Sequence, residues 1–436
     1  MPSLTERDQQ VIWHPYTQMK TAGAPLPIVR GAGSYLYHED GTAYLDAVSS
    51  WWVNLHGHAH PYIAEQVSAQ LLQLEHVIFA GFTHPPAVTL AERLLQHLPS
   101  RQARIFYSDN GSTAVEIGIK MARQYYYNQG EQQRCRLVAF EEAFHGETFG
   151  AMSASGDHDF NRAFQDQFFE VWRIPAPTTP DRARQALALL EGYLQTGEVY
   201  AFLFEPLVLG AGGMLMYEAS VLDELIACCH RYGALCIADE VMTGFGRTGR
   251  TFACDYLREQ PDIMCLSKGL TGGTLPLAVT TCSAAVFDAF WSEDKLKAFF
   301  HGHSYTANPV GCAAALASLD LLESRECQEN IARISARHQA FRATVVDHPA
   351  LVRVQQTGTI LALEFATSSQ TSYFNSLRDQ LYYFFMERGI LLRPLGNVIY
   401  VLPPYCTTDE QLADIYAAIQ ASFELVEGFA ETVDAS

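Results

Sequence analysis

Short runs of apolar residues alternate with amphipathic stretches between about residues 61 and 324. Strands that are apolar on both faces are typical of a parallel sheet that helices cover on both sides. The stretches between the runs, such as 113–128 and 221–232, carry apolar residues at helical spacing. The pattern predicts an α/β fold with a mostly parallel sheet, whose strands we expect at 104–107, 137–140, 201–204, 234–238, 263–266 and 277–281.

The two ends of the chain have a different pattern. Toward the C-terminus, short apolar runs alternate closely with helical stretches at 376–388 and 408–424, which predicts a smaller α+β domain with strands at 352–354, 360–365, 390–393 and 398–402. Near the N-terminus, 34–37 and 43–47 are strand-like. We expect residues 1–60 to pack with the small domain and the active site, 61–325 to form the large domain, and 326–436 to form the small one.

Composition and charge exclude several classes of protein. A chain of 436 residues is long enough for two domains, and its formal net charge of −19 repels nucleic-acid phosphates and anionic membrane surfaces. The longest uncharged stretch, 269–287, holds three glycines and a proline, which does not suit a membrane helix. The ten cysteines include no C-x-x-C pair, and no apolar leader begins the chain. We therefore expect a soluble, cytoplasmic enzyme without nucleic-acid or membrane partners.

An acidic pair and a lysine follow two of the predicted strands. Asp239 and Glu240 end the strand at 234–238, and Lys268 follows the strand at 263–266. Taken separately, the acids suit a metal site or a helix cap, and a lysine after a strand is usually solvated. Together, at the carboxyl edge of a parallel sheet where ligands bind, they suit a pyridine cofactor. A carboxylate there can keep the ring nitrogen protonated, and the lysine can bind the cofactor's aldehyde covalently.

A phosphate site is predicted where the strand at 104–107 leads into a helix. Asn110, Gly111, Ser112 and Thr113 stand at that junction, and Thr113 has the capping-box spacing to Glu116. A glycine there lets the backbone approach an anion, and the free amides and dipole of the helix start favour negative charge. Many ordinary helices begin in the same way, so this motif depends on the acid and lysine for its meaning.

Each of the remaining motifs has both a functional and a structural interpretation. Phe144 follows the strand at 137–140 and either stacks on the cofactor or packs into the core. The glycine-rich run 244–249 contains an arginine and lacks a strand–turn–helix setting, so we interpret it as a tight loop on the cofactor side and not as a dinucleotide site. The histidines at 56–60 and 301–303 have no partners at metal-ligand spacing, and those loops more simply line a site. Cys228 and Cys229 fit the core face of a helix, and we expect no metal.

These motifs, taken together, resemble the class III, fold type I, pyridoxal-phosphate-dependent aminotransferases over almost the whole chain. The class-level signals are the runs 110–112, 239–240, 243–249 and 267–269. The resemblance implies a mostly parallel sheet of the seven-stranded type in the large domain. It also implies the cofactor pyridoxal 5′-phosphate, with Lys268 as the lysine that binds it and Asp239 as the partner of its ring nitrogen.

The resemblance implies roles for further residues. Gly111 and Ser112 would bind the phosphate, and Phe144 would stack on the ring. His303 and Ser304 would reach the phosphate of a neighbouring subunit's cofactor, which implies a homodimer with shared active sites. The residues implied to line the substrate site are Tyr16, Trp51, Phe144, Arg247, Gly302, Arg393 and Tyr400.

The runs 13–17 and 49–52, with Arg393, Tyr400 and 403–405, narrow the resemblance to members that aminate 8-amino-7-oxononanoate in biotin synthesis. The implied reaction is ping-pong transfer of an amino group from S-adenosylmethionine to that ketone, which gives 7,8-diaminononanoate. Phe144 stands where users of this donor carry tyrosine, so lysine is the alternative donor. His303 and Ser304 replace a commoner proline and threonine.

The sequence also allows two alternative functions. One is an aminotransferase for another ω-amino acid, or an aminomutase, in the same family. The other is a catalytically inactive binding protein, against which the intact pair of Asp239 and Lys268 argues.

Overall fold

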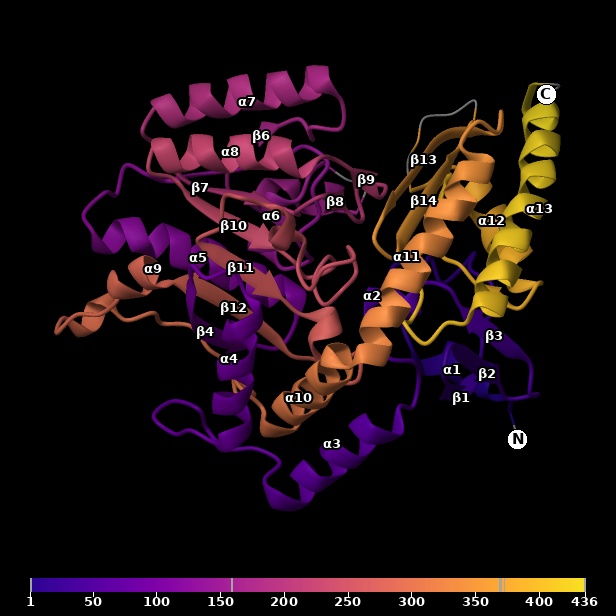
Figure 1. The fold of residues 1–436 in the computed structure, drawn as a ribbon, viewed down its shortest axis with the longest axis horizontal. Coiled ribbons are helices and arrows are strands. Elements are labelled where there is room, and N and C mark those ends of the chain that lie inside the picture. Colours follow the sequence, from indigo (N-terminus) through magenta and orange to yellow (C-terminus); the bar gives the residue numbers. More distant parts are fainter. Residues whose placement is uncertain (1, 158–159, 368–370, 372, 435–436) are drawn as a thin grey trace.

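The structure is a computed structural model that describes residues 2–157, 160–367, 371 and 373–434 (Figure 1). A seven-stranded sheet forms its centre, in the order β4-β12-β11-β10-β7-β5-β6. Only β12 among these strands runs antiparallel to its neighbours, so the predicted mostly parallel sheet is confirmed. The strands are β4 (Gln102–Ser108), β5 (Arg136–Phe140), β6 (Val171–Ile174), β7 (Val199–Phe204), β10 (Leu235–Asp239), β11 (Ile263–Leu266) and β12 (Ala278–Ser283).

The apolar strands bury both of their faces, because alternate side chains point to opposite sides of the sheet. In β7, Phe202 and Phe204 pack in the core that α7 and α8 cover, whereas Ala201 and Leu203 pack in the core under α5. This arrangement explains why the strands are continuous apolar runs in the sequence.

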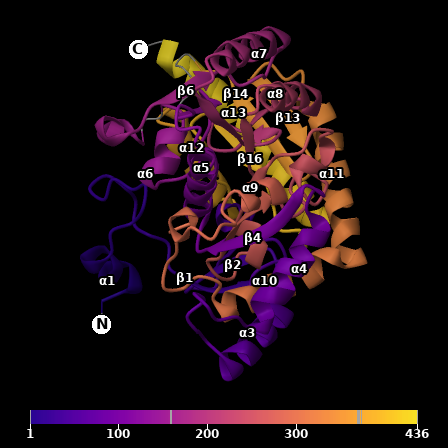
Figure 2. The ribbon, with the colours of Figure 1, turned by 90° about the vertical axis from the view of Figure 1, so that its left-hand side faces the viewer.

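Helices and short elements surround the sheet, and Figure 2 shows α1 at the edge of the molecule. Within the described ranges, none of the helices combines the length and the apolar character needed to cross a membrane. The elements are α1 (Leu4–Val11), α2 (Ser49–Trp52), α3 (Pro61–Gln73), α4 (Pro85–His97), α5 (Gly111–Asn128), α6 (Phe149–Ala154), η1 (Arg162–Gln167), α7 (Pro180–Gln195), β8 (Val208–Leu209), β9 (Leu215–Met216), α8 (Ala219–Arg231), η2 (Ala253–Tyr256), η3 (Lys268–Thr271), α9 (Ala284–Asp288), η4 (Lys295–Lys297) and α10 (Pro309–Glu323).

The C-terminal part forms a second, smaller sheet, which lies to the right in Figure 1. Its antiparallel strand order is β13-β14-β16, and it is flanked by helices, as the sequence predicts for an α+β unit. The elements are α11 (Arg325–Val345), β13 (Leu351–Thr357), β14 (Ile360–Phe365), α12 (Leu377–Met386), β16 (Val398–Val401) and α13 (Asp409–Asp434).

The N-terminal segment pairs with a strand from the C-terminal part. The strands β1 (Ile28–Ala32), β2 (Tyr35–His38) and β3 (Ala43–Asp46) form one sheet with β15 (Ile390–Leu391), which runs parallel to β3. The predicted strand at 390–393 therefore exists in shortened form, but it does not belong to the sheet of β13, β14 and β16. The division into domains at residues 60 and 325 stays a prediction, and α10 gives way to α11 at Ser324, next to the second of these positions.

A histidine at the end of α8 joins that helix to the loop before β11. His230 Nε2 lies 3.3 Å from Asp262 Oδ2, and its Nδ1 lies 3.3 Å from Glu259 Oε2. Asp262 also accepts the amide of Cys236 at 2.8 Å and pairs with Arg101 at 2.6 Å. His230, Cys236 and Asp262 thus bring possible metal-ligand atoms within 4.8 Å of one another, although hydrogen bonds within the protein already account for their positions.

Cys228 and Cys229 are buried in the core, as predicted.

His230 predicts a pH-dependent contribution to stability. The hydrogen bond to Asp262 raises the pKa of His230 to about 10. Since the folded pKa lies above the usual value of about 6.5, the stabilisation is complete below that pH and disappears as the pH rises through 10. The pair is partly exposed, so its contribution should be about 1 kcal/mol at most. The melting temperatures of wild type and His230→Asn should differ at pH 6 and converge above pH 10; a constant difference would contradict this prediction.

Candidate active site

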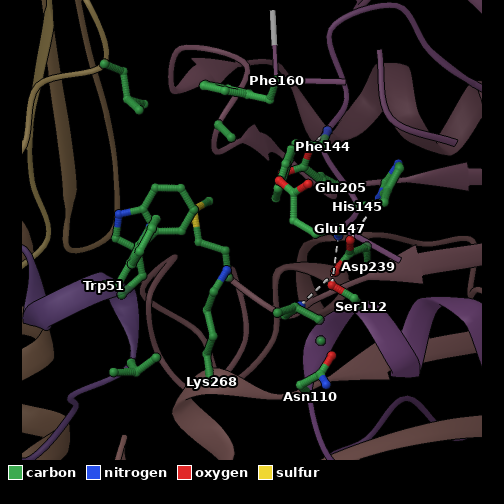
Figure 3. A pocket seen from close by; sticks show the side chains of 18 of the residues that line it. Trp51, Asn110, Ser112, Phe144, His145, Glu147, Phe160, Glu205, Asp239 and Lys268 are labelled. Carbon is green, nitrogen blue, oxygen red and sulfur yellow. Dashed lines mark hydrogen bonds and ion pairs between the residues drawn. The ribbon is translucent and has the colours of Figure 1, made fainter. Parts of the chain in front are cut away.

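The carboxyl ends of five strands meet at one edge of the central sheet and surround a cavity of about 570 Å³ (Figure 3). Residues just beyond β4, β5, β7, β10 and β11 line it, and side chains from the N-terminal segment and the C-terminal part close its other side. Ligands bind at this edge of open α/β sheets, and the volume is typical of a small-molecule site.

Lys268 and Asp239 both face this cavity from neighbouring strands. Asp239 is the last residue of β10 and pairs in register with Cys265 of β11, three residues before the lysine. The backbone of Lys268 is left-handed, with φ 41°, which is uncommon for a residue with a side chain and is found mainly at functional sites. Burial lowers the pKa of Lys268, against the opposing effect of the carboxylates of Asp239 and Glu205. A larger share of neutral amine makes it a better nucleophile.

His145 holds the carboxylate of Asp239. Its Nδ1 donates to Asp239 Oδ2 at 2.8 Å, and Asp239 Oδ1 accepts the amide of Val241 at 3.1 Å. Both side chains are buried, and His145 Nε2 has no hydrogen-bond partner among the residues that the structure describes. The sequence motifs assigned no role to this histidine. The available signal was that β5 lies close to β10 in a parallel sheet, so loops after both strands meet at one edge.

Glu205 is a second buried acid that the sequence analysis missed. It directly follows β7, and its two carboxylate oxygens accept the amides of Phe144 at 3.0 Å and Gly210 at 2.9 Å. Burial raises its pKa to about 7, while nearby His145 acts in the opposite direction. An acid at the end of the apolar run Val199–Phe204 was the sequence signal. Glu205 fixes the backbone that places Phe144 on the cavity wall.

The N-terminus of α5 points toward the cavity, but its cap differs from the prediction. The expected capping box of Thr113 with Glu116 is wrong: Asn110 caps the helix, accepting the amide of Thr113 at 3.1 Å, and Thr113 Oγ1 accepts the amide of Asn110 at 3.2 Å. Asparagine is itself a strong N-cap, so the helix begins before Thr113. Glu116 instead accepts the amide of Gly150 at 2.6 Å.

Two glycines allow close packing at this corner. A Cβ on Gly111 would lie 2.7 Å from Val241 Cγ1, and a Cβ on Gly146, whose φ is +130°, would lie 2.2 Å from Ser112 Oγ. Ser112 Oγ accepts the amide of Glu147 at 3.0 Å. The first amides of a helix have no partner within the helix, so this corner offers donors to an anion.

Aromatic side chains and an arginine form the opposite wall. The guanidinium carbon of Arg393 lies 4.6 Å from the ring centre of Trp51, which packs edge-on against Tyr16 at 5.4 Å. Tyr400 is buried and packs against Trp52 at 5.9 Å, and the amine of Lys268 lies 4.6 Å from the Trp52 ring centre. The structure therefore brings a set of predicted residues to one cavity, namely Tyr16, Trp51, Gly111, Ser112, Phe144, Asp239, Lys268, Arg393 and Tyr400.

Arg247 lies elsewhere, although it was expected to line the substrate site. Its side chain is fully buried and donates to the carbonyl oxygens of Pro403 at 2.8 Å and Asn54 at 3.1 Å, with Tyr405 packed against it. The loop 244–249 turns inward and joins the central sheet to the C-terminal part, so its arginine does not reach the cavity.

The histidine loops also lie outside the cavity of their own chain. His56 bonds Ser318 at 3.1 Å and His58 bonds Asp46 at 2.8 Å, so these two stabilise the fold and do not line the site as expected. Gly302, His303 and Ser304 stand between η4 and α10, away from the cavity lining. Their expected contact with a neighbouring subunit's cofactor stays a prediction, as does the absence of a metal.

Comparison with known proteins settles the family. The family model for aminotransferase class-III matches residues 16–423. The chain belongs to the class III aminotransferases. One relative is the adenosylmethionine-8-amino-7-oxononanoate aminotransferase of Synechococcus elongatus. The two sequences are 48% identical over 415 residues, which cover 94% of this chain and 97% of the relative.

Solved structures agree with this class III assignment. The adenosylmethionine-8-amino-7-oxononanoate aminotransferase of Methanocaldococcus jannaschii superposes with a TM-score of 0.92 at 34% identity and covers 98% of each chain. An omega transaminase from Pseudomonas jessenii in complex with PMP superposes with a TM-score of 0.93 at 26% identity and covers 99% of each chain. The fold is therefore shared within the family by enzymes whose names give different activities.

Proposed function

We propose that this class III aminotransferase transfers the amino group of S-adenosylmethionine to 8-amino-7-oxononanoate, which gives 7,8-diaminononanoate for biotin synthesis. The observation that carries the proposal is one cavity with Lys268 and Asp239 at its inner end and Arg393 stacked on Trp51 at its wall. A reacting amine at one end and a carboxylate receptor at the other match a long keto acid. The relatives named for this reaction support the choice.

The cavity fits pyridoxal 5′-phosphate, judged by its own side chains. Gly111 and Gly146 let the chain pack closely around the start of α5, where a Cβ would clash, and the first amides of this helix suit the phosphate. Asp239, held by His145, offers a buried carboxylate to a protonated ring nitrogen, and Phe144 stands beside it on the wall. When bound, this cofactor supplies a reactive carbonyl and a ring that withdraws electrons from the substrate carbon.

Lys268 would hold the cofactor and would also be the group that moves the proton. Its free amine would stand beside the substrate carbon that bears the amino group, where it would take up and give back a proton as general base and then acid. Burial lowers the pKa of Lys268, which favours the neutral amine that this role requires. Asp239 would stabilise positive charge on the ring nitrogen, while the hydrogen bond from His145 keeps its carboxylate in place.

The wall opposite the sheet binds the acceptor. Trp51 and Tyr16 present apolar ring surface to the methylene chain, and each buried methylene contributes about 0.8 kcal/mol. Arg393 can bind the terminal carboxylate with two hydrogen bonds, and its stacking on Trp51 fixes the plane of the guanidinium. Tyr400, buried behind Trp52, supports the same wall.

Arg393→Ala should weaken acceptor binding because a carboxylate would enter the site without its partner. The expected loss in kcat/KM for 8-amino-7-oxononanoate is about 2–5 kcal/mol, or about 30-fold to a few thousand-fold. Wild type should prefer the acid strongly over its uncharged methyl ester, and the variant should lose this preference. Arg393→Lys should fall between the two. Equal preference for acid and ester in wild type would rule out the assigned role.

The quaternary structure and location are part of the proposal. We propose a cytoplasmic homodimer, in which His303 and Ser304 of one subunit approach the phosphate bound by its neighbour. These residues lie outside the cavity of their own chain, which is consistent with a role at the active site of the other subunit.

Lysine as donor is the second candidate, because Phe144 lacks the hydroxyl that users of S-adenosylmethionine carry there. An assay of 8-amino-7-oxononanoate with S-adenosylmethionine, lysine or another ω-amino acid, with the product identified by mass spectrometry, decides among the candidates. Product from S-adenosylmethionine is expected. Product from lysine alone would make lysine the donor, and activity only with other ketones would refute the proposed function.

A further inference from the structure

Aromatic side chains from four separate segments gather on the cavity wall opposite the sheet. We call Tyr16, Trp51, Phe160 and Tyr373 the outer aromatic cluster; all four line the cavity. The ring centres of Tyr16 and Phe160 are 5.5 Å apart, and those of Phe160 and Tyr373 are 4.7 Å apart. In Figure 3, Phe160 lies on the far side of the cavity from Lys268. The cluster therefore faces the part of a substrate that extends away from the reacting carbon.

A carboxylate accompanies this cluster. Glu147 lines the cavity, accepts a hydrogen bond from the hydroxyl of Tyr16, and has its backbone tied to Ser112 Oγ. Its side chain is exposed to solvent. Arg378 lies 4.5 Å from the ring centre of Tyr373 and helps to hold that ring in place. Aromatic faces beside an acid are the surroundings in which proteins recognise organic cations.

The cavity wall thus has two unlike parts. Trp51 carries the guanidinium of Arg393, whereas Glu147 and Phe160 contact Tyr16, and Tyr373 packs on Phe160. The acceptor has a carboxylate and no cation at the end away from its ketone, so that end suits the part of the wall formed by Trp51 and Arg393. The donor, in contrast, carries a positive charge away from its reacting amine. Its sulfonium stands three bonds from the carbon that bears this amine, and the sulfur also carries the adenosyl group with its adenine.

We propose that Glu147, Phe160 and Tyr373 form the subsite that recognises the sulfonium and adenine of the amino donor. This inference rests on the proposed function. The carboxylate attracts the sulfonium, and the rings stack on adenine and contact the positively charged sulfur. The ε-ammonium of lysine can meet the same carboxylate, but it has no ring to stack. Phe160 therefore selects between the two donors, and this subsite offsets the missing hydroxyl at Phe144.

The first test separates the two half-reactions in the holoenzyme. Phe160→Leu should lower kcat/KM for conversion of the bound cofactor by S-adenosylmethionine about tenfold, the effect expected from losing one aromatic contact to a cation. The subsequent reaction with 8-amino-7-oxononanoate should change less than about twofold. Phe169→Leu, an exposed phenylalanine nearby in the chain and outside the cavity, is the matched control and should leave both half-reactions unchanged. Rapid-mixing absorbance measures each half-reaction.

The second test measures binding without turnover. The probes are 5′-methylthioadenosine, which is neutral, and its S-methylated sulfonium; neither carries an α-amino group that can react. Quenching of tryptophan fluorescence in the holoenzyme should show tighter binding of the sulfonium in wild type. Glu147→Gln should remove that preference, Phe160→Leu should weaken both probes, and the exposed control Glu224→Gln should retain wild-type behaviour.

The outcomes distinguish this inference from the function on which it rests. If S-adenosylmethionine does not convert the wild-type cofactor, the proposed donor is wrong. If it does, but Phe160→Leu slows both half-reactions equally or neither, the subsite is wrong. A sulfonium preference that survives Glu147→Gln would also overturn it.

Discussion

Replacing Lys268 by alanine is expected to abolish multiple turnovers. The variant loses the amine that holds the cofactor and the group that moves the proton, and the proton transfer alone is typically worth about 10²–10⁴ in rate. No other lysine is among the residues lining the described cavity, so nothing there can replace it. The loss should therefore exceed that range and leave at most slow stoichiometric conversion.

Steady-state assays with 8-amino-7-oxononanoate and excess donor measure this effect. Lys295→Ala, which changes an exposed lysine in η4, should retain wild-type activity and serves as the control. Retention of repeated turnover by Lys268→Ala would remove the basis of the mechanism.

Asp239→Asn should give the second largest loss, about 10²- to 5 × 10³-fold in kcat. An amide cannot stabilise positive charge on a ring nitrogen, and removing one partner from a buried ion pair costs about 3–5 kcal/mol. The substitution also leaves His145, whose Nε2 lacks a partner within the described part of the chain, beside a neutral side chain.

A companion variant separates charge from position. His145→Asn can still donate a hydrogen bond to Asp239 and should lose less activity than Asp239→Asn. The kcat values of Asp239→Asn and His145→Asn are compared, and the absorbance of the bound cofactor is measured as a function of pH. Together they report on the protonation of the ring nitrogen. Identical activity in Asp239→Asn and wild type would show that the carboxylate does not face that nitrogen.

The central sheet was predictable because both faces of its strands are buried, which leaves uninterrupted apolar runs in the sequence. β6 (Val171–Ile174) was missed because it is a short edge strand with Trp172 and Arg173 at its centre. The pairing of β3 with β15 joins residues about 345 positions apart, and no local pattern specifies such a partner.

The candidate site was predictable where one residue type has one chemical use at the end of a strand, as for Asp239 and Lys268. His145 and Glu205 were missed because their importance comes from contacts with Asp239 and Phe144 that only the folded sheet creates. Arg247 was misplaced because its motif does not reveal that the loop turns inward. The predicted role of His303 concerns a second subunit, which the sequence of one chain cannot position.

The most direct test of this account is borohydride reduction of the holoenzyme followed by peptide mass spectrometry. The account predicts one modified peptide, with the added mass of the reduced cofactor on Lys268. An unmodified Lys268, or the added mass on another lysine, would contradict it.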